Sequence, residues 1–205
     1  MSPYIRNGLC LLLLAVFGCS QNESDKQSDE AIKGPGLAQL DAVRKMRSAQ
    51  GGRESLGGIS VAVPDGWRTV DPSSSMRVAE YHMSGARPQD KDATLAVFAG
   101  NMGSVEANVE RWFGQFTRPG GAAESPRRWQ QQVDGMEATL VDIRGTYSPG
   151  MGRGTDAAPA PDYRMLGAIV STGRTSFYFK LVGPRDTVAL WVPIFKEFIG
   201  GIKKE

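Results

Sequence analysis

Residues 165–184 read MLGAIVSTGRTSFYFKLVGP, and this stretch decides the fold. Two apolar runs, Met165 to Ser171 and Ser176 to Val182, flank the polar segment Thr172-Gly173-Arg174. Short runs that are rich in branched and aromatic residues favour strands, and a short connection that contains glycine favours a hairpin. The stretch therefore predicts two neighbouring antiparallel strands.

The residues after this hairpin predict an amphipathic helix. Gly183-Pro184 ends the second run, and large apolar residues then recur at helical spacing. They are Val188, Trp191, Val192, Phe195, Phe198, Ile199 and Ile202. Pro193 interrupts the pattern, which predicts a kink or a break there. Because the spacing keeps its phase past the proline, we expect both halves to pack on the same sheet.

The earlier part of the chain repeats both patterns. Predicted strands are Ile59 to Val63, Met76 to Met83, Thr94 to Ala99, Arg128 to Val133 and Met136 to Tyr147. Asp134-Gly135 between the last two is a strong hairpin signal. Val105 to Phe116 predicts a helix with one apolar face and Ser104 as its N-cap. The order predicts an α+β fold, a twisted antiparallel sheet of about six or seven strands with two main helices packed on it.

The segment Ser148 to Asp162 interrupts this pattern. It holds six glycines and prolines, and Met151 is its one large apolar residue. Glycine raises the entropy cost of ordering a segment, and proline lacks the N–H that a sheet needs. We expect a mobile insert near 148–162, either a disordered bulge or a loop that binds a partner.

The first 18 residues predict an export signal. Leu9 to Phe17 is an unbroken apolar run, whose helix would span roughly 14 Å, about half of a bilayer core. The end of this run, Val16-Phe17-Gly18-Cys19, resembles the bacterial lipobox, although Phe17 stands where a small or hydroxyl residue is usual. The resemblance implies a lipoprotein signal peptide over 1–18 and attachment to a membrane through lipid on Cys19. The alternative is an ordinary secretory signal with an incidental Cys19.

Residues 19–57 predict a tether between that anchor and the folded part. Ser20 to Asp29 contains almost nothing apolar and cannot bury a core. Gly51-Gly52 and Gly57-Gly58 follow before the first predicted strand. Residues 58–205 are therefore predicted to form a single α+β domain.

Two short motifs resemble a known superfamily. Pro64-Asp65-Gly66-Trp67 follows the first predicted strand, and Phe179-Lys180-Leu181-Val182-Gly183-Pro184 leads into the last helix. Both are similar to the superfamily of the photosystem II extrinsic protein PsbP and the Ran-binding import factor Mog. Residues 73–81 resemble bacterial lipoproteins of unknown function. The resemblance implies a twisted antiparallel sheet with helices on both faces, used mainly to bind proteins, and it implies no catalytic residues.

The composition restricts the chemistry. The chain has 24 Lys and Arg against 22 Asp and Glu, and nucleic-acid binding usually needs a strongly basic face, so no nucleic-acid partner is predicted.

Most serine and cysteine nucleophiles need a histidine base, and His82 is the single histidine. Glu80 would share its face, so an acid–base pair is conceivable, but a strand position facing solvent is the favoured interpretation. Because zinc needs three or four Cys or His ligands, no metal or cofactor site is predicted.

Each of two further segments could bind a ligand or could have a purely structural role. Gly100 to Gly103 precedes a helix and could bind an anion there, although a turn is the favoured interpretation. Arg127-Arg128-Trp129 could contact phosphate and a stacked base, although a charged strand edge is favoured. Trp67, Trp112 and Trp191 are predicted to pack in the core.

These patterns support two hypotheses of function. The first is a non-enzymatic, lipid-anchored module of the bacterial cell envelope that faces the periplasm or exterior and binds another envelope protein. The second is a small enzyme or ligand-binding lipoprotein that acts on cell-wall or polysaccharide material. Paired carboxylates about 5 to 9.5 Å apart would favour a glycosidase-like version of the second.

Overall fold

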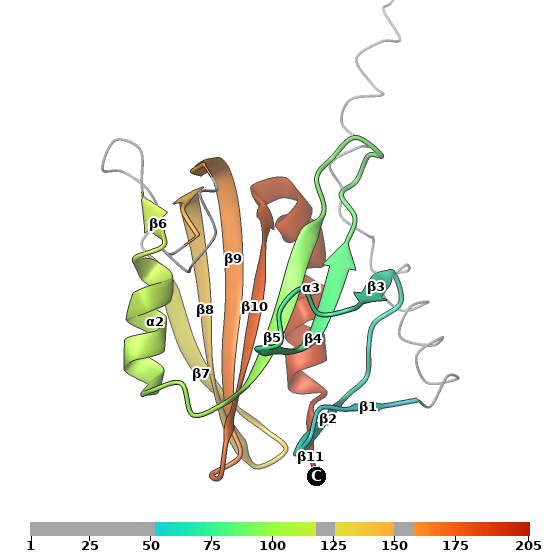
Figure 1. Ribbon diagram of the computed structural model, residues 1–205, viewed down its shortest axis with the longest axis vertical. Helices are drawn as coiled ribbons and strands as arrows, with labels where there is room; N and C mark the ends of the chain where they lie inside the picture. The colour runs from blue at the N-terminus through green and yellow to red at the C-terminus, as the bar shows by residue number, and fades with distance from the viewer. Residues whose placement is uncertain (1–51, 118–125, 150–157) are drawn as a thin grey trace, which may run out of the picture. The chain divides into compact units, whose positions relative to one another are not determined.

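A computed structural model describes residues 52–117, 126–149 and 158–205 of the chain (Figure 1). The described residues all belong to one compact unit, Pro35–Glu205. The predicted signal peptide (1–18), Cys19 and most of the predicted tether lie outside them. The described residues form the helices α2 (Val105–Phe113) and α3 (Arg185–Gly200). The strands are β1 (Glu54–Ser55), β2 (Ile59–Val61), β3 (Trp67–Val70), β4 (Arg77–Met83), β5 (Ala93–Gly100), β6 (Phe116–Thr117), β7 (Arg127–Val133), β8 (Met136–Tyr147), β9 (Ala160–Ser171), β10 (Ser176–Pro184) and β11 (Lys203–Lys204).

The main sheet is antiparallel throughout its eight strands. Its order is β3-β4-β5-β10-β9-β8-β6, and β7 also pairs with β8. The predicted hairpin forms its centre, with Phe177 opposite Val170 and Leu181 opposite Leu166. A separate small sheet joins β1, β2 and β11. The predicted α+β class is confirmed. The first predicted strand, Ile59 to Val63, forms β2 of the small sheet, and the short strands β3 and β6, which were not predicted, join the two ends of the main sheet.

Side chains alternate between two cores, one on each face of the sheet. Phe177, Phe179 and Leu181 of β10 belong to the larger core, which also contains the buried residues of α3. Tyr178 of the same strand belongs to the smaller core, which contains Trp112 of α2. Figure 1 shows α2 in front of the sheet and α3 behind it. The two helices therefore cover opposite faces, as the superfamily resemblance implies.

Helix α2 ends earlier than predicted. Ser104 is its N-cap, and its hydroxyl oxygen accepts from the Ala107 N–H at 3.1 Å. The helix stops at Phe113, and the N–H of Gly114 bonds to the Glu110 carbonyl. Phe116, predicted to be helical, instead pairs with Tyr147 as part of β6. An apolar side chain at this position can be buried from a strand as well as from a helix, so periodicity alone misplaced the end.

Helix α3 runs continuously from Arg185 to Gly200 through Pro193, so of the predicted kink or break, the break is absent. Pro193 and Ala189, one turn earlier, are both exposed. The carbonyl that loses its partner therefore faces water, which can satisfy it. Both halves of the helix bury residues against the same face, as predicted.

The predicted insert near 148–162 ends at an earlier residue than expected. Residues 150–157 lie outside the described part of the chain, but β9 already begins at Ala160, which pairs with Tyr147. The next ladder pair is Gly145 with Tyr163, so β9 carries one extra residue in a bulge. Pro161 and Asp162, the latter with a φ of 57°, occupy this bulge. The sheet tolerates a proline there because a bulge leaves a residue unpaired.

Candidate functional site

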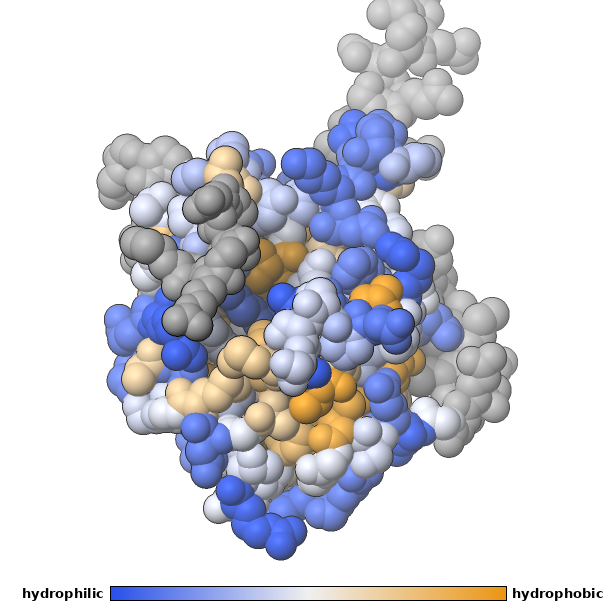
Figure 2. Space-filling view, viewed as in Figure 1, coloured by the Kyte–Doolittle hydropathy of each residue, from blue (hydrophilic) through white to orange (hydrophobic). Residues whose placement is uncertain are grey.

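One part of the α2 side of the sheet is left open by the helix. Lys180 on β10, Ala96 on β5 and Glu80 on β4 lie side by side across neighbouring strands. On the other side of Lys180, a Cβ built on Gly167 would lie 2.6 Å from the Trp112 ring. Helix α2 therefore covers β8 and β9, and we call the α2-side surface of β4, β5 and β10 the open face. Figure 2, viewed from this side, shows apolar surface surrounded by polar groups.

Lys180 is the central cation of the open face. Its Nζ donates to Gln115 Oε1 at 2.6 Å and to the Tyr147 hydroxyl at 3.3 Å. The end of α2 positions Gln115, and β6 joins that segment to Tyr147 on β8. Burial, and then the charges of Arg111 and Arg77, lower the pKa of Lys180 to about 8. The amine therefore lies in surroundings that are unfavourable to its charged form.

Aromatic rings flank this lysine, three of them on the neighbouring strands β6, β8 and β9 and one on β5 of the open face itself. Tyr147 stacks against Tyr163 with the ring centroids 6.1 Å apart, and Phe116 lies 5.1 Å from Tyr147. Lys180 Nζ itself is 5.3 Å from the centroid of the Tyr147 ring. On β5, Phe98 lies under the Arg77 guanidinium at 5.9 Å. An aromatic ring therefore lies beside each of the two cations, Lys180 and Arg77.

Glu80 is the acidic group of the open face, and local donors hold it. Its Oε2 accepts from the Ser73 N–H at 2.7 Å and lies 2.8 Å from Arg77 Nη1. Burial alone would raise the pKa of Glu80, but the bonds from Ser73 and Arg77 outweigh it and lower the pKa to about 2. The carboxylate stays ionised at neutral pH and is already bound, so it is poorly suited to accept a proton from a substrate.

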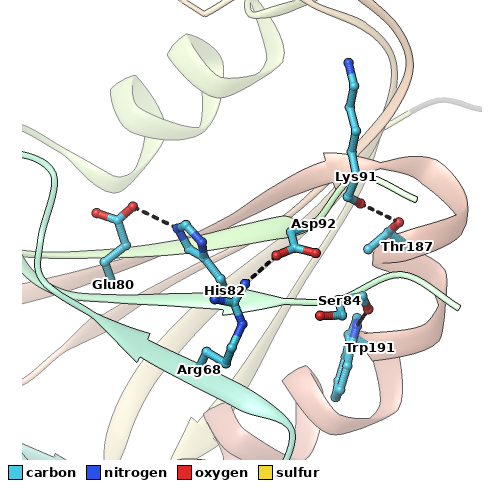
Figure 3. Close-up of polar contacts among 8 residues, drawn as sticks. All are labelled: Arg68, Glu80, His82, Ser84, Lys91, Asp92, Thr187 and Trp191. Atoms are coloured by element: carbon cyan, nitrogen blue, oxygen red, sulfur yellow. Dashed lines mark hydrogen bonds and ion pairs between the residues drawn. The ribbon is translucent and has the colours of Figure 1, made fainter. Parts of the chain in front are cut away.

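His82 neighbours Glu80 as the sequence suggested. Its Nε2 lies 3.4 Å from Glu80 Oε1, and 32% of its side chain is exposed (Figure 3). The neighbouring Arg68 is engaged with Asp92 at 2.5 Å. No group of three or more His, Cys, Asp or Glu suited to a metal occurs among the described residues. The histidine is therefore a strand residue paired with one carboxylate.

Figure 3 also shows how the loop beside His82 is attached to α3. Trp191 Nε1 donates to the Ser84 carbonyl at 2.9 Å, and the Thr187 hydroxyl donates to the Lys91 carbonyl at 3.0 Å. These bonds fix the predicted polar loop from Ser84 to Asp92 onto the helix. They give Trp191 a polar contact at the rim of the core.

Replacing His82 by alanine is expected to change the free energy of unfolding by no more than about 0.5 kcal/mol, because the side chain is one third exposed and its polar contact, with Glu80, is long at 3.4 Å. Chemical denaturation of the purified variant measures this, and a cellular assay of the protein's role measures function. Loss of function in a variant that unfolds like the wild type would contradict the expectation and favour a chemical role for the pair Glu80 and His82.

The structure places the other candidates from the sequence in structural roles. Arg127 Nη2 contacts Asp142 at 3.1 Å, and Arg128 Nη1 contacts Glu106 at 2.6 Å. Trp129 lies beneath Lys196, 5.4 Å from its Nζ. At the end of the Gly100 to Gly103 segment, the Ser104 hydroxyl caps α2 by accepting from the Ala107 N–H. Trp67 and Trp112 are buried as predicted, and Trp191 is half-buried.

Sequence reasoning missed the group around Lys180. The available signal was one charged residue inside the apolar run from Phe177 to Val182, at a position that faces the second core. Gln115 and Tyr147 gave no signal, because nothing in the sequence shows that the end of α2 reaches β10. Only the sheet order brings α2, β8 and β10 together.

The class defined by these features is an α+β protein with an antiparallel sheet and one helix on each face. No family model and no curated protein matches the sequence. Among solved structures, cyanobacterial PsbP from Synechocystis sp. PCC 6803 is similar, with a TM-score of 0.47, 12% identity and coverage of 72% of this chain and 87% of that one.

Two further solved structures are similar to the chain. LpqN of Mycobacterium tuberculosis, described as involved in cell envelope biogenesis, has a TM-score of 0.45 and 14% identity, covering 80% of this chain and 95% of its own. A Pseudomonas aeruginosa protein of unknown function, PA94, has a TM-score of 0.43 and 13% identity, covering 69% and 88%. Likenesses at these values transfer no function to the chain.

Proposed function

We propose that the protein is a non-enzymatic, lipid-anchored envelope module that binds another protein. The observation that carries the binding role is the exposure of Met76 (68%) and Val78 (41%), two large hydrophobic side chains that lie open to solvent. They flank Arg77 at the start of β4. Neighbouring apolar side chains in water favour contact with a partner surface.

The position of these residues suits a partner that adds an extended segment. Strand β3 pairs only with residues 80–83 of β4, so β4 extends past the end of its neighbour. Val78 is the extra residue in a bulge, because Arg77 pairs with Phe98 and Ala79 with Val97. Extended segments bind at sheet edges through main-chain hydrogen bonds, and side-chain contacts add specificity. Met76 and Val78 would provide those contacts.

The rival hypothesis, a small enzyme acting on glycans, is less well supported. It needs two carboxylates that face each other across a substrate. Glu80 and Asp142 are the buried carboxylates of the described residues, and arginines hold both, Arg77 in the first case and Arg164 in the second. Each carboxylate therefore has a structural partner already.

A crosslinking experiment tests the proposal. A photo-crosslinking amino acid at position 78 of the anchored protein is expected to capture one protein in cells, and the same amino acid at Gln132, on the opposite edge strand β7, is not. The captured protein is then purified and its affinity measured. The double variant Met76→Ser and Val78→Thr is expected to weaken that affinity about tenfold or more. Unchanged affinity, or identical products from both positions, would count against this edge as the binding site.

Replacing Cys19 by alanine is expected to release the protein into the soluble fraction. The predicted h-region is too short to span a bilayer, and no helix in the described ranges is long and apolar enough to cross a membrane. Fractionation of cells fed with labelled fatty acid measures both attachment and modification. A variant that stays in the membrane fraction and still incorporates label would show that Cys19 is not the lipid site.

A further inference from the structure

We propose that the open face binds a small organic anion, a carboxylate attached to a planar apolar group, with Lys180 and Arg111 at the carboxylate and the rings of Tyr147 and Phe98 against the apolar part. This site lies on the α2 side of the sheet and does not depend on the proposed protein-binding edge. Three features support it: unneutralised cations, an unused donor, and flanking rings.

Cations outnumber carboxylates at the open face and on the part of α2 beside it, where Arg111 lies. Arg77 is paired with Glu80. Lys180 and Arg111 form no ion pair among the described residues, and Arg111 donates instead to the amide oxygen of Asn108. A half-buried cation without a counterion is costly, and a bound anion offsets that cost. The lowered pKa of Lys180, caused by burial and by Arg111 and Arg77, agrees with this imbalance.

Lys180 keeps a donor for a ligand. A charged lysine amine has three N–H groups, and within the described ranges it donates to two acceptors, Gln115 Oε1 and the Tyr147 hydroxyl. These two acceptors come from α2 and β8 and hold the amine in place. The third N–H remains for a ligand oxygen, and hydrogen bonds between charged partners are among the stronger ones in proteins.

The flanking rings select the other half of the ligand. Tyr147 is held from one side by Tyr163 and from another by Phe116, so its ring is fixed before a ligand arrives. Phe98 lies on β5, the strand next to Lys180 on the side away from β9, and it is diagonal to Lys180 because it pairs with Tyr178. Planar groups pack well against such rings in offset or edge-on arrangements. An inorganic anion would contact the cations but would leave the aromatic rings exposed to water.

Calorimetric titration of the purified full chain with benzoate tests the site. Benzamide, of the same shape without the charge, and inorganic phosphate, a charge without the ring, are the comparison ligands. We expect benzoate to bind about tenfold more tightly than either, which corresponds to about 1.4 kcal/mol. Equal binding of benzamide would remove the role of the cations, and equal binding of phosphate would remove the role of the rings. Either result would overturn the proposal.

Variants locate the binding. Lys180→Met keeps the packing of the stem and removes the charge, and it is expected to lower benzoate affinity about tenfold while leaving benzamide unchanged. Lys196→Met is the matched control, because Lys196 also lies over a ring, that of Trp129, but on the opposite face. Should Lys180→Met unfold, Arg111→Gln at the surface of α2 provides the same test. If the Lys180→Met variant folds and binds benzoate with full affinity, the proposed site is refuted. If Lys180→Met does not fold, full benzoate affinity in the folded Arg111→Gln variant refutes it.

Discussion

Replacing Asp142 by asparagine is expected to lower the free energy of unfolding by about 3–5 kcal/mol, the usual cost of leaving a buried charge without its partner. Arg164 Nε donates to Asp142 Oδ1 at 2.8 Å and Arg164 Nη2 to Oδ2 at 2.7 Å. Only 7% of the Arg164 side chain and 4% of the Asp142 side chain are exposed. The asparagine is nearly the same size, so packing is preserved and the loss measures the uncompensated guanidinium. The denaturant midpoints of the wild type and the variant measure this loss of stability.

Two companion variants separate the buried pair from its surroundings. Arg127 also contacts Asp142, but 63% of its side chain is exposed, so Arg127→Gln is expected to cost less than about 1 kcal/mol. The double variant Asp142→Leu with Arg164→Met replaces the pair by apolar groups and is expected to recover most of the stability. A midpoint for Asp142→Asn equal to that of the wild type would mean that the pair is not buried as described.

The same pair predicts the direction of the pH dependence. Burial alone would raise the pKa of Asp142, but the hydrogen bonds and charge of Arg164 outweigh it and lower the pKa below its ordinary value. The stabilisation from Asp142 is therefore complete above the unfolded pKa of about 3.9 and is lost as the pH falls through the lower folded pKa. The wild type should lose this part of its stability in acid, and the double leucine–methionine variant should not.

The fold could be predicted where local signals agree. Asp134-Gly135 and Thr172-Gly173-Arg174 marked both long hairpins, and two apolar faces marked α2 and α3. The short strands β3, β6 and β11 could not be predicted, because two to four residues show no reliable period. Phe116 illustrates the problem, since its burial fits either a helix or a strand until its partner Tyr147 is known.

The functional groups were harder to predict than the fold. Asp142 and Arg164 lie 22 positions apart along the chain, and only the register of β8 with β9 brings them together. Lys180 depends on contacts from three separate elements. A charged residue inside an apolar strand is a local signal that a partner must exist, but the identity of that partner is a property of the sheet order. Candidate sites of this kind follow from topology and not from motifs.

Trp112→Ala and Phe195→Ala are each expected to destabilise the protein by about 3–5 kcal/mol, the range for truncating a buried aromatic side chain. Trp112 is 5% exposed and Phe195 is 1% exposed. Trp112 packs directly on Gly167 of β9, which has no side chain of its own to fill the space that its removal leaves. Phe113, adjacent on α2 and half-buried, is the matched control for Trp112, and its replacement by alanine should cost clearly less.

The two large truncations also test whether the sheet separates two independent cores. Trp112 belongs to the core under α2 and Phe195 to the core under α3. Substitutions without shared contacts usually add within about 0.5 kcal/mol. The milder pair Trp112→Phe and Phe195→Leu keeps the double variant folded, because the total stability of a domain is only about 5–15 kcal/mol. The loss in the double variant should equal the sum of the single losses. A difference of more than about 1 kcal/mol between the loss in the double variant and that sum would mean that the sheet transmits the packing change from one face to the other. The two side chains occupy separate cores, and the strands between them are the structure that both cores share.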